Sequence, residues 1–77
     1  MKDLLLYVAR NLVDDPDSVT VIETESDDGS VLLKLHVAPG DMGKVIGRQG
    51  RIAKEIRTLL KAAGQKENKK VTVDIVD

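Results

Sequence analysis

The sequence contains no cysteine, a single histidine and a single aromatic residue among its 77 positions. Without cysteine, a disulfide framework, a thiolate zinc site and a cysteine nucleophile are excluded. One histidine, His36, argues against a metal centre and against a histidine-based catalytic pair. One aromatic residue, Tyr7, excludes a binding surface built from rows of stacked rings. We therefore expect neither a cofactor nor an enzymatic activity.

Long apolar runs are absent as well. No stretch approaches the roughly 18 residues of a membrane-spanning helix, and the first residues, Met1 to Leu4, lack the pattern of a signal peptide. Together with the absence of cysteine, this predicts a cytoplasmic protein with no membrane association. A chain with 42% apolar and 32% charged residues at this length is typical of one small folded domain, spanning residues 1–77.

The net charge of −1 conceals an uneven distribution of charge along the chain. Residues 1–41 carry three basic and nine acidic side chains, whereas residues 42–77 carry nine basic and four acidic ones. All nine of these basic residues lie between Gly43 and Lys70. This distribution fits either a positive surface that binds a polyanion or lysines that only solvate a helix.

Apolar residues at helical spacing predict three helices. The first covers Lys2 to Val13. The second is short, from Met42 to Ile46, with Asp41 as its N-cap. The third runs from about Arg51 to Ala63 and ends at Gly64, a residue typical of helix C-termini. The buried stripe of the third helix is predicted to comprise Ile52, Ala53, Ile56, Leu59, Leu60 and Ala63.

β-branched residues and apolar–polar alternation predict three strands, over Ser18 to Glu25, Val31 to Val37 and Val71 to Val76. The Asp28-Gly29 pair between the first two strands favours a β-hairpin. Because helices separate the second strand from the third, we expect these two strands to be parallel. The sequence thus predicts an α+β domain of order α-β-β-α-α-β, with helices on one face of a three-stranded mixed sheet.

Two glycines interrupt the helical pattern between the second and third helices, in the segment Gly47-Arg48-Gln49-Gly50. Glycine within a helical run costs roughly 1 kcal/mol relative to alanine, so the pair indicates a sharp bend with exposed backbone. The next helix directs its free N–H groups and positive dipole end at this bend. With Lys44 and Arg51 nearby, the segment predicts a phosphate-binding site. The alternative is a plain turn between two helices.

Nucleotide-binding loops of known type do not match this segment. The dinucleotide fingerprint places Gly-x-Gly-x-x-Gly directly after a strand, whereas the glycines here are Gly43, Gly47 and Gly50, within a helical region. The Walker pattern ends in Gly-Lys-Ser/Thr, but Arg51-Ile52 follows the last glycine here. The sequence therefore disfavours a nucleotide cofactor as the ligand.

The segment Val45-Ile46-Gly47-Arg48-Gln49-Gly50-Arg51-Ile52 resembles the signature of KH domains, an Ile-Gly-x-x-Gly-x-x-Ile motif whose glycine loop clamps about four nucleotides. Ala53 stands at the position of the last isoleucine. The order of elements resembles the type II arrangement of that family over about residues 1–76. A single KH domain that starts Met-Lys-Asp-Leu-Leu is similar to the KhpA family of small bacterial RNA-binding proteins.

The resemblance implies the residues that bind RNA. Gly47 and Gly50 are the loop glycines, and Arg48 and Gln49 face the phosphates. The apolar groove that accepts bases is assigned to Met42, Val45, Ile46 and Ile52. The flanking cations are Lys44, Arg51 and Lys54.

The resemblance also implies partners and a role. Members of the family bind single-stranded RNA, form homodimers and are similar to proteins that pair with a larger KH protein, KhpB (also called Jag or EloR). The implied function is RNA chaperoning or post-transcriptional regulation linked to cell shape and cell wall biogenesis. The alternative is a protein-interaction module of KH fold with little RNA affinity. Candidate residues for a dimer surface are Ile22, Leu32 and Leu6.

Two further features are given structural interpretations. His36 is expected to be a surface or interface histidine rather than a ligand or a base. The acidic cluster of Asp14, Asp15 and Asp17 is expected to end a helix and form turn contacts beside Pro16 rather than to bind a cation.

Overall fold

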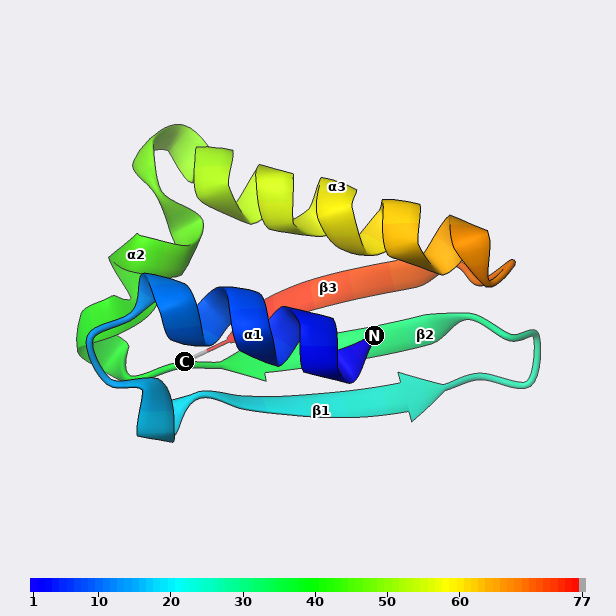
Figure 1. Cartoon of the computed structure of the whole chain (residues 1–77), viewed down its shortest axis with the longest axis horizontal. Coiled ribbons are helices and arrows are strands. Elements are labelled where there is room, and N and C mark those ends of the chain that lie inside the picture. Colours follow the sequence, from blue (N-terminus) through cyan, green and yellow to red (C-terminus); the bar gives the residue numbers. More distant parts are fainter. Residues whose placement is uncertain (77) are drawn as a thin grey trace.

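The computed structural model describes residues 1–76, which form helices and strands in the predicted order (Figure 1). The α-helices are α1 (Lys2–Leu12), α2 (Met42–Ile46) and α3 (Arg51–Lys66). The strands are β1 (Thr20–Glu25), β2 (Val31–His36) and β3 (Val71–Val76). Short 3-10 turns precede β1, α2 and α3, and these are η1 (Pro16–Ser18), η2 (Pro39–Asp41) and η3 (Arg48–Gly50). Within residues 1–76, no helix is both long and apolar enough to cross a membrane.

The sheet is mixed, with the strand order β1-β2-β3. β1 and β2 form the predicted antiparallel hairpin, while β2 and β3 are parallel and are connected through α2 and α3. In the hairpin turn, Gly29 has a φ of +85°. The Asp28 carboxylate accepts hydrogen bonds from the backbone N–H (2.9 Å) and the hydroxyl group (2.6 Å) of Ser30. This topology confirms the predicted α+β fold.

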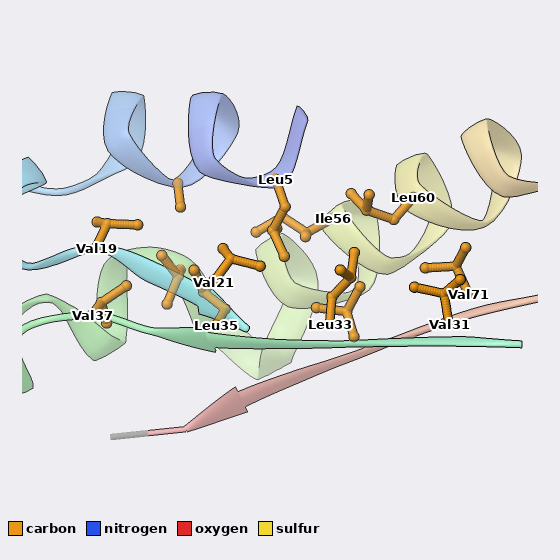
Figure 2. Close-up of a cluster of buried hydrophobic side chains, with 13 residues drawn as sticks. Leu5, Val19, Val21, Val31, Leu33, Leu35, Val37, Ile56, Leu60 and Val71 are labelled. Atoms are coloured by element: carbon orange, nitrogen blue, oxygen red, sulfur yellow. The ribbon is translucent and has the colours of Figure 1, made fainter. Parts of the chain in front are cut away.

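The hydrophobic core lies between the sheet and the two longer helices (Figure 2). Val31, Leu33 and Leu35 of β2 are buried in this core, as their alternation predicted. Leu5 of α1 and Leu60 of α3 belong to the same cluster and are fully buried. The alternate residues of β2 are half-buried or exposed. The helices therefore cover one face of the sheet and leave the other face open.

α3 continues past Gly64, so the prediction that Gly64 caps this helix is wrong. A Cβ atom at Gly64 would lie 2.5 Å from Val71 Cγ2 and 2.8 Å from the Lys69 carbonyl oxygen, so glycine here permits close packing. The helix ends instead in a Schellman motif around Asn68, which has a φ of +55°. The Lys69 N–H donates to Gly64 O (2.8 Å), and the Asn68 N–H donates to Gln65 O (3.1 Å).

Two smaller predictions also need correction. The helical spacing predicts Leu59 in the buried stripe of α3, but Leu59 is 43% exposed. It borders a groove between α1 and α3 that Val8 and Leu12 also line. β1 begins at Thr20, two residues later than predicted, because Pro16–Ser18 forms a 3-10 turn.

Candidate functional site

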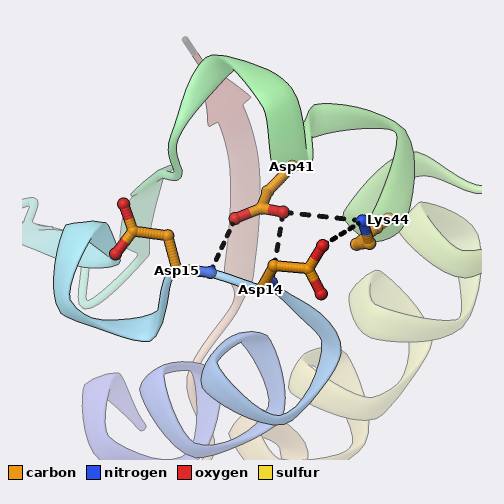
Figure 3. A network of polar contacts seen from close by, with 4 residues as sticks. All are labelled: Asp14, Asp15, Asp41 and Lys44. Carbon is orange, nitrogen blue, oxygen red and sulfur yellow. Dashed lines mark hydrogen bonds and ion pairs between the residues drawn. The ribbon is translucent and has the colours of Figure 1, made fainter.

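α2 begins in a network of polar contacts centred on Asp41 (Figure 3). Asp41 is buried, with 4% of its surface exposed. Its carboxylate oxygens accept hydrogen bonds from the backbone N–H groups of Asp14 (3.1 Å) and Asp15 (3.0 Å). Asp41 occupies the N-cap position of α2, as predicted, but its side chain makes no capping hydrogen bond to the helix. Its carboxylate instead ties the segment after α1 to the start of α2.

Lys44 of α2 lies beside two carboxylates. Its Nζ atom is 2.8 Å from Asp14 Oδ2 and 3.8 Å from Asp41 Oδ1. The hydrogen bond to Asp14 is the main cause that raises the pKa of the Lys44 ammonium group above its ordinary value. The structure thus places Lys44 next to the loop, as predicted, but engaged in an ion pair.

The acidic cluster after α1 (Asp14, Asp15 and Asp17) forms the predicted turn contacts at one of its residues. Asp15 Oδ2 accepts a hydrogen bond from Ser18 Oγ (2.6 Å), which is the expected kind of turn contact. Asp14 differs, because its carboxylate is the partner of Lys44. Nothing local to the cluster predicts this contact, since the two residues are 30 positions apart.

The loop from Gly47 to Gly50 consists mostly of backbone with positive φ. The φ angles are +75° at Gly47, +57° at Gln49 and +73° at Gly50. α2 ends at this loop, where the Gly47 N–H donates to Gly43 O (2.9 Å) and the chain then leaves the helical region. A glutamine with positive φ is uncommon, and such strain often marks functional sites. Arg48 and Gln49 are both exposed at the tip of the bend.

The two loop glycines meet different surroundings. A Cβ atom at Gly47 would lie 2.6 Å from Ile52 Cγ1, so this glycine packs directly on a side chain of α3. A Cβ atom at Gly50 would meet nothing within 4 Å. The backbone at Gly50 is therefore bare on its outer side, where a ligand can approach it closely.

Positive charge gathers around this bare backbone. The exposed residues Arg48, Gln49 and Arg51 line a shallow hollow at the loop. Lys54 lies on α3 one turn after Arg51 and is also exposed. Among the described residues no side chain caps the N-terminus of α3. The Arg51 N–H donates to Arg48 O, and the dipole of this 16-residue helix adds to the positive potential at the loop.

The predicted apolar groove residues do not share one surface. Val45 is fully buried, and Ile52 is half-buried in the groove between α1 and α3, beneath Gly47. Ile52 thus supports the loop from inside the molecule, and Val45 belongs to the hydrophobic core. Ile46 is 37% exposed and Met42 is half-buried, so these two retain surface near the loop.

Arg57 is a residue of this region that the sequence analysis missed. Its Nε donates to the Val73 carbonyl oxygen of β3 (3.3 Å). Because the Val31 N–H donates to Lys70 O, the backbone groups of Val71, Val73 and Ile75 point to the free edge of the sheet. Arg57 thus bridges α3 and the free edge of β3. The spacing of Lys54, Arg57 and Lys61 on one side of α3 could have indicated it.

The fold and the loop together define a class of protein. An exposed Gly-x-x-Gly loop between two helices, within the order α-β-β-α-α-β and a mixed sheet, is a type II KH domain. The family model of the KhpA/KhpB KH domain matches residues 2–75. The chain belongs to this KhpA/KhpB KH-domain family.

Similar proteins span the whole chain. A protein named RNA-binding protein KhpA from Clostridium acetobutylicum is 59% identical over 76 residues, which cover 99% of this chain and 100% of the relative. The KhpA of Listeria monocytogenes is 49% identical over 77 residues, covering both chains completely. That of Aquifex aeolicus is 44% identical over 77 residues, which are 100% of this chain and 96% of the relative.

Proposed function

We propose that this protein binds single-stranded RNA without catalysing a reaction, and that it clamps the sugar-phosphate backbone at the Gly47–Gly50 loop. The observation that carries the proposal is the bare backbone at Gly50, which lies between the exposed cations Arg48 and Arg51. Proteins named for RNA binding match the chain over its full length, which supports the same ligand.

The clamp works through backbone and charge. A phosphate beside Gly50 approaches closely because no side chain holds it away. There it faces the N-terminus of α3, whose N–H groups and dipole favour an anion. Arg48, Arg51 and Lys54 neutralise the neighbouring phosphates, and Lys44 lies one helical turn before Gly47.

The bases then lie beside the loop. Ile46 offers exposed apolar surface there, and Met42 is half-buried next to it. Ile52 contributes from below through its contact with Gly47, and Val45 anchors α2 in the core. Arg57, which is hydrogen-bonded to Val73 O, lies where α3 meets the free edge of β3. An RNA strand that runs along α3 from the loop would contact its guanidinium group there.

We expect binding in the micromolar range for one domain. Stacking on aromatic rings, worth about 1–3 kcal/mol per base, is unavailable because the chain has only Tyr7. If about three phosphates are neutralised, log K falls with log salt at a slope of roughly −2. A titration at several salt concentrations measures this slope.

The decisive test replaces the two residues between the glycines. In the variant Arg48→Asp/Gln49→Asp, two carboxylates face the phosphates, so we expect the affinity for a fluorescein-labelled 12-nucleotide oligouridylate to fall at least about tenfold. Fluorescence anisotropy measures the affinity, and circular dichroism verifies the fold.

A matched control is Gln65→Asp/Lys66→Asp, which changes the net charge equally at exposed positions near the other end of α3. It should retain most of the affinity. Equal losses in both variants would contradict a clamp at the loop. Absence of binding by the unmodified protein would favour the alternative, a KH-fold module that acts through partner proteins.

We further propose that the protein acts in the cytoplasm as an RNA chaperone or post-transcriptional regulator, linked to cell shape and cell wall biogenesis. Membership of the KhpA/KhpB family supports a pairing with a larger KH protein of the KhpB type. Crosslinking in cells, followed by sequencing of the bound RNA, tests the regulatory role with the loop variant as control. Loss of crosslinked transcripts only in the variant is the expected result.

A homodimer is part of the proposal, because linking two domains strengthens modest single-site binding. Away from the loop, exposed large apolar side chains are Ile22 on the open face of the sheet, Tyr7 on α1 and Leu59 on α3. Leu6 and Leu32 are half-buried. Light scattering on Ile22→Asp and Leu59→Asp distinguishes the surfaces, since the variant at the true interface should become monomeric. Monomeric unmodified protein would contradict the homodimer.

A further inference from the structure

The two carboxylates beside Lys44 differ in what else holds them. Asp41 is buried and accepts two backbone hydrogen bonds, so its position is fixed whether or not Lys44 is present. The side chain of Asp14 is 82% exposed. Within the described residues, its carboxylate is hydrogen-bonded to Lys44 alone. The Asp14 carboxylate is therefore the closer partner of Lys44, and it is also the partner that is exposed to solvent. A competing anion can replace it.

We propose that Asp14 competes with an RNA phosphate for the Lys44 ammonium group, and thereby limits the affinity of the loop for RNA. This inference rests on the function proposed above. Lys44 lies one helical turn before Gly47, on the helix that carries the loop. In the free protein, Asp14 occupies the Lys44 ammonium group at 2.8 Å (Figure 3). A phosphate at the loop therefore competes with this carboxylate for the Lys44 ammonium group.

The network keeps the competitor in place. Because the Asp14 N–H is bonded to Asp41, the backbone of Asp14 does not leave when its side chain releases Lys44. The displaced carboxylate therefore remains close to the ammonium group and continues to compete for it. It also stays near the incoming phosphate, which it repels. Exposed ion pairs are weak, so the exchange changes affinity by a small factor rather than blocking binding.

The test is a double-mutant cycle on Asp14 and Lys44, using the same labelled oligouridylate at low salt. Asp14→Asn keeps the shape and the backbone hydrogen bond but removes the charge, and we expect it to bind about two- to fivefold more tightly than the unmodified protein. In the Lys44→Ala background, Asp14→Asn should give a much smaller gain, because no ammonium group is released.

Asp17→Asn is the matched control. It removes one negative charge from the same acidic cluster, at an exposed residue of η1, and should change affinity less than Asp14→Asn. Equal gains from Asp14→Asn and Asp17→Asn, or an undiminished gain in the Lys44→Ala background, would overturn the inference while leaving RNA binding intact. Failure of all these proteins to bind the oligonucleotide would overturn the proposed function itself. Thermal unfolding verifies that each variant folds.

Discussion

The two ends of α2 are built on opposite principles. Directly before its first residue, the buried Asp41 carboxylate accepts hydrogen bonds from two backbone N–H groups of a segment more than 25 residues earlier in the chain. At its last residue, the helix enters a loop whose backbone has positive φ and whose tip is exposed. One end is fixed by polar contacts inside the molecule, and the other presents its backbone to solvent.

This difference explains how a five-residue helix can hold an exposed loop in a defined conformation. So short a helix is unstable on its own, and Val45 is its single fully buried residue among those described. The contacts at Asp41 supply the missing constraint. In the proposed clamp, an anchored start and a bare end together mean that the loop does not have to be ordered when a phosphate binds.

The largest effect is expected at the bare end, where the two glycines should respond differently. Gly47→Ala forces a side chain into positive φ and places its Cβ against Ile52, so we expect it to lower the free energy of unfolding by about 3–5 kcal/mol. Gly50→Ala meets open space and carries only the backbone strain, about 1–2 kcal/mol. Urea unfolding monitored by circular dichroism measures both.

The same pair should separate stability from binding. Gly50→Ala is expected to weaken RNA binding more than its small loss of stability suggests, because its methyl group would occupy the open space where the proposed clamp places a phosphate. Gly47→Ala should cost less in the Ile52→Ala background than in the unmodified protein, because Ile52→Ala removes the Cγ1 atom that the new Cβ would meet at 2.6 Å. Equal destabilisation by the two single variants would contradict the difference between the glycines.

The second effect concerns the anchored end. Asp41→Ala removes the acceptor of two backbone N–H groups and leaves Asp14 and Asp15 without this partner. Hydrogen bonds to a charged group contribute about 1.5–3 kcal/mol each, so we expect a loss of about 3 kcal/mol in urea unfolding. Asp17→Ala, at an exposed aspartate nearby, is the control and should cost less than about 0.5 kcal/mol. A similar cost in both variants would mean that Asp41 is not an anchor.

Most of the fold follows from local sequence patterns. Alternation along Val31, Leu33 and Leu35 predicts the buried face of the central strand, and the Asp28-Gly29 pair predicts the hairpin. The interruption of a helical pattern by two glycines predicts the loop and its exposed tip. These features succeed because each is decided within a few residues of chain.

The features that the sequence did not reveal depend on distant contacts. Asp41 fits the pattern of an N-cap, but its partners are 26 and 27 residues away. Gly64 fits the pattern of a helix end, but Val71 packs against it from the next strand. In the sequence, Arg57 is one of several cations on α3. Only its hydrogen bond to the carbonyl oxygen of Val73 sets it apart. No local pattern encodes these pairings.

The third prediction concerns a glycine between the two ends of α2. Gly43 lies inside the helix, and a Cβ atom there would meet nothing within 4 Å. Gly43→Ala should therefore raise the free energy of unfolding by about 0.5–1 kcal/mol, because alanine favours the helical backbone. Gly64→Ala, also in a helix, should lower it by about 1–3 kcal/mol, because Val71 and Lys69 occupy the space. Effects of the same sign would contradict this account of the two glycines.

The smallest expected effect is a dependence of stability on pH at Asp28. Like Asp41, Asp28 accepts a hydrogen bond from a backbone N–H, but its carboxylate is exposed. Hydrogen bonds from Ser30 lower the pKa of the Asp28 carboxyl below its ordinary value of 3.8. A carboxylate whose pKa is lower in the folded state adds stability above its unfolded pKa and loses it as the pH falls through its folded pKa.

Asp28→Asn isolates this contribution, because asparagine suits the same turn but carries no charge. The melting temperature of the unmodified protein should exceed that of the variant slightly at pH 7, and the gap should close below pH 3.8. Because the group is fully exposed, added salt should narrow the gap at pH 7. Asp41 differs in this respect, since its buried hydrogen bonds should leave the effect of Asp41→Ala nearly unchanged by salt. A gap at Asp28 that persists in strong acid would mean that its charge plays no part in the turn.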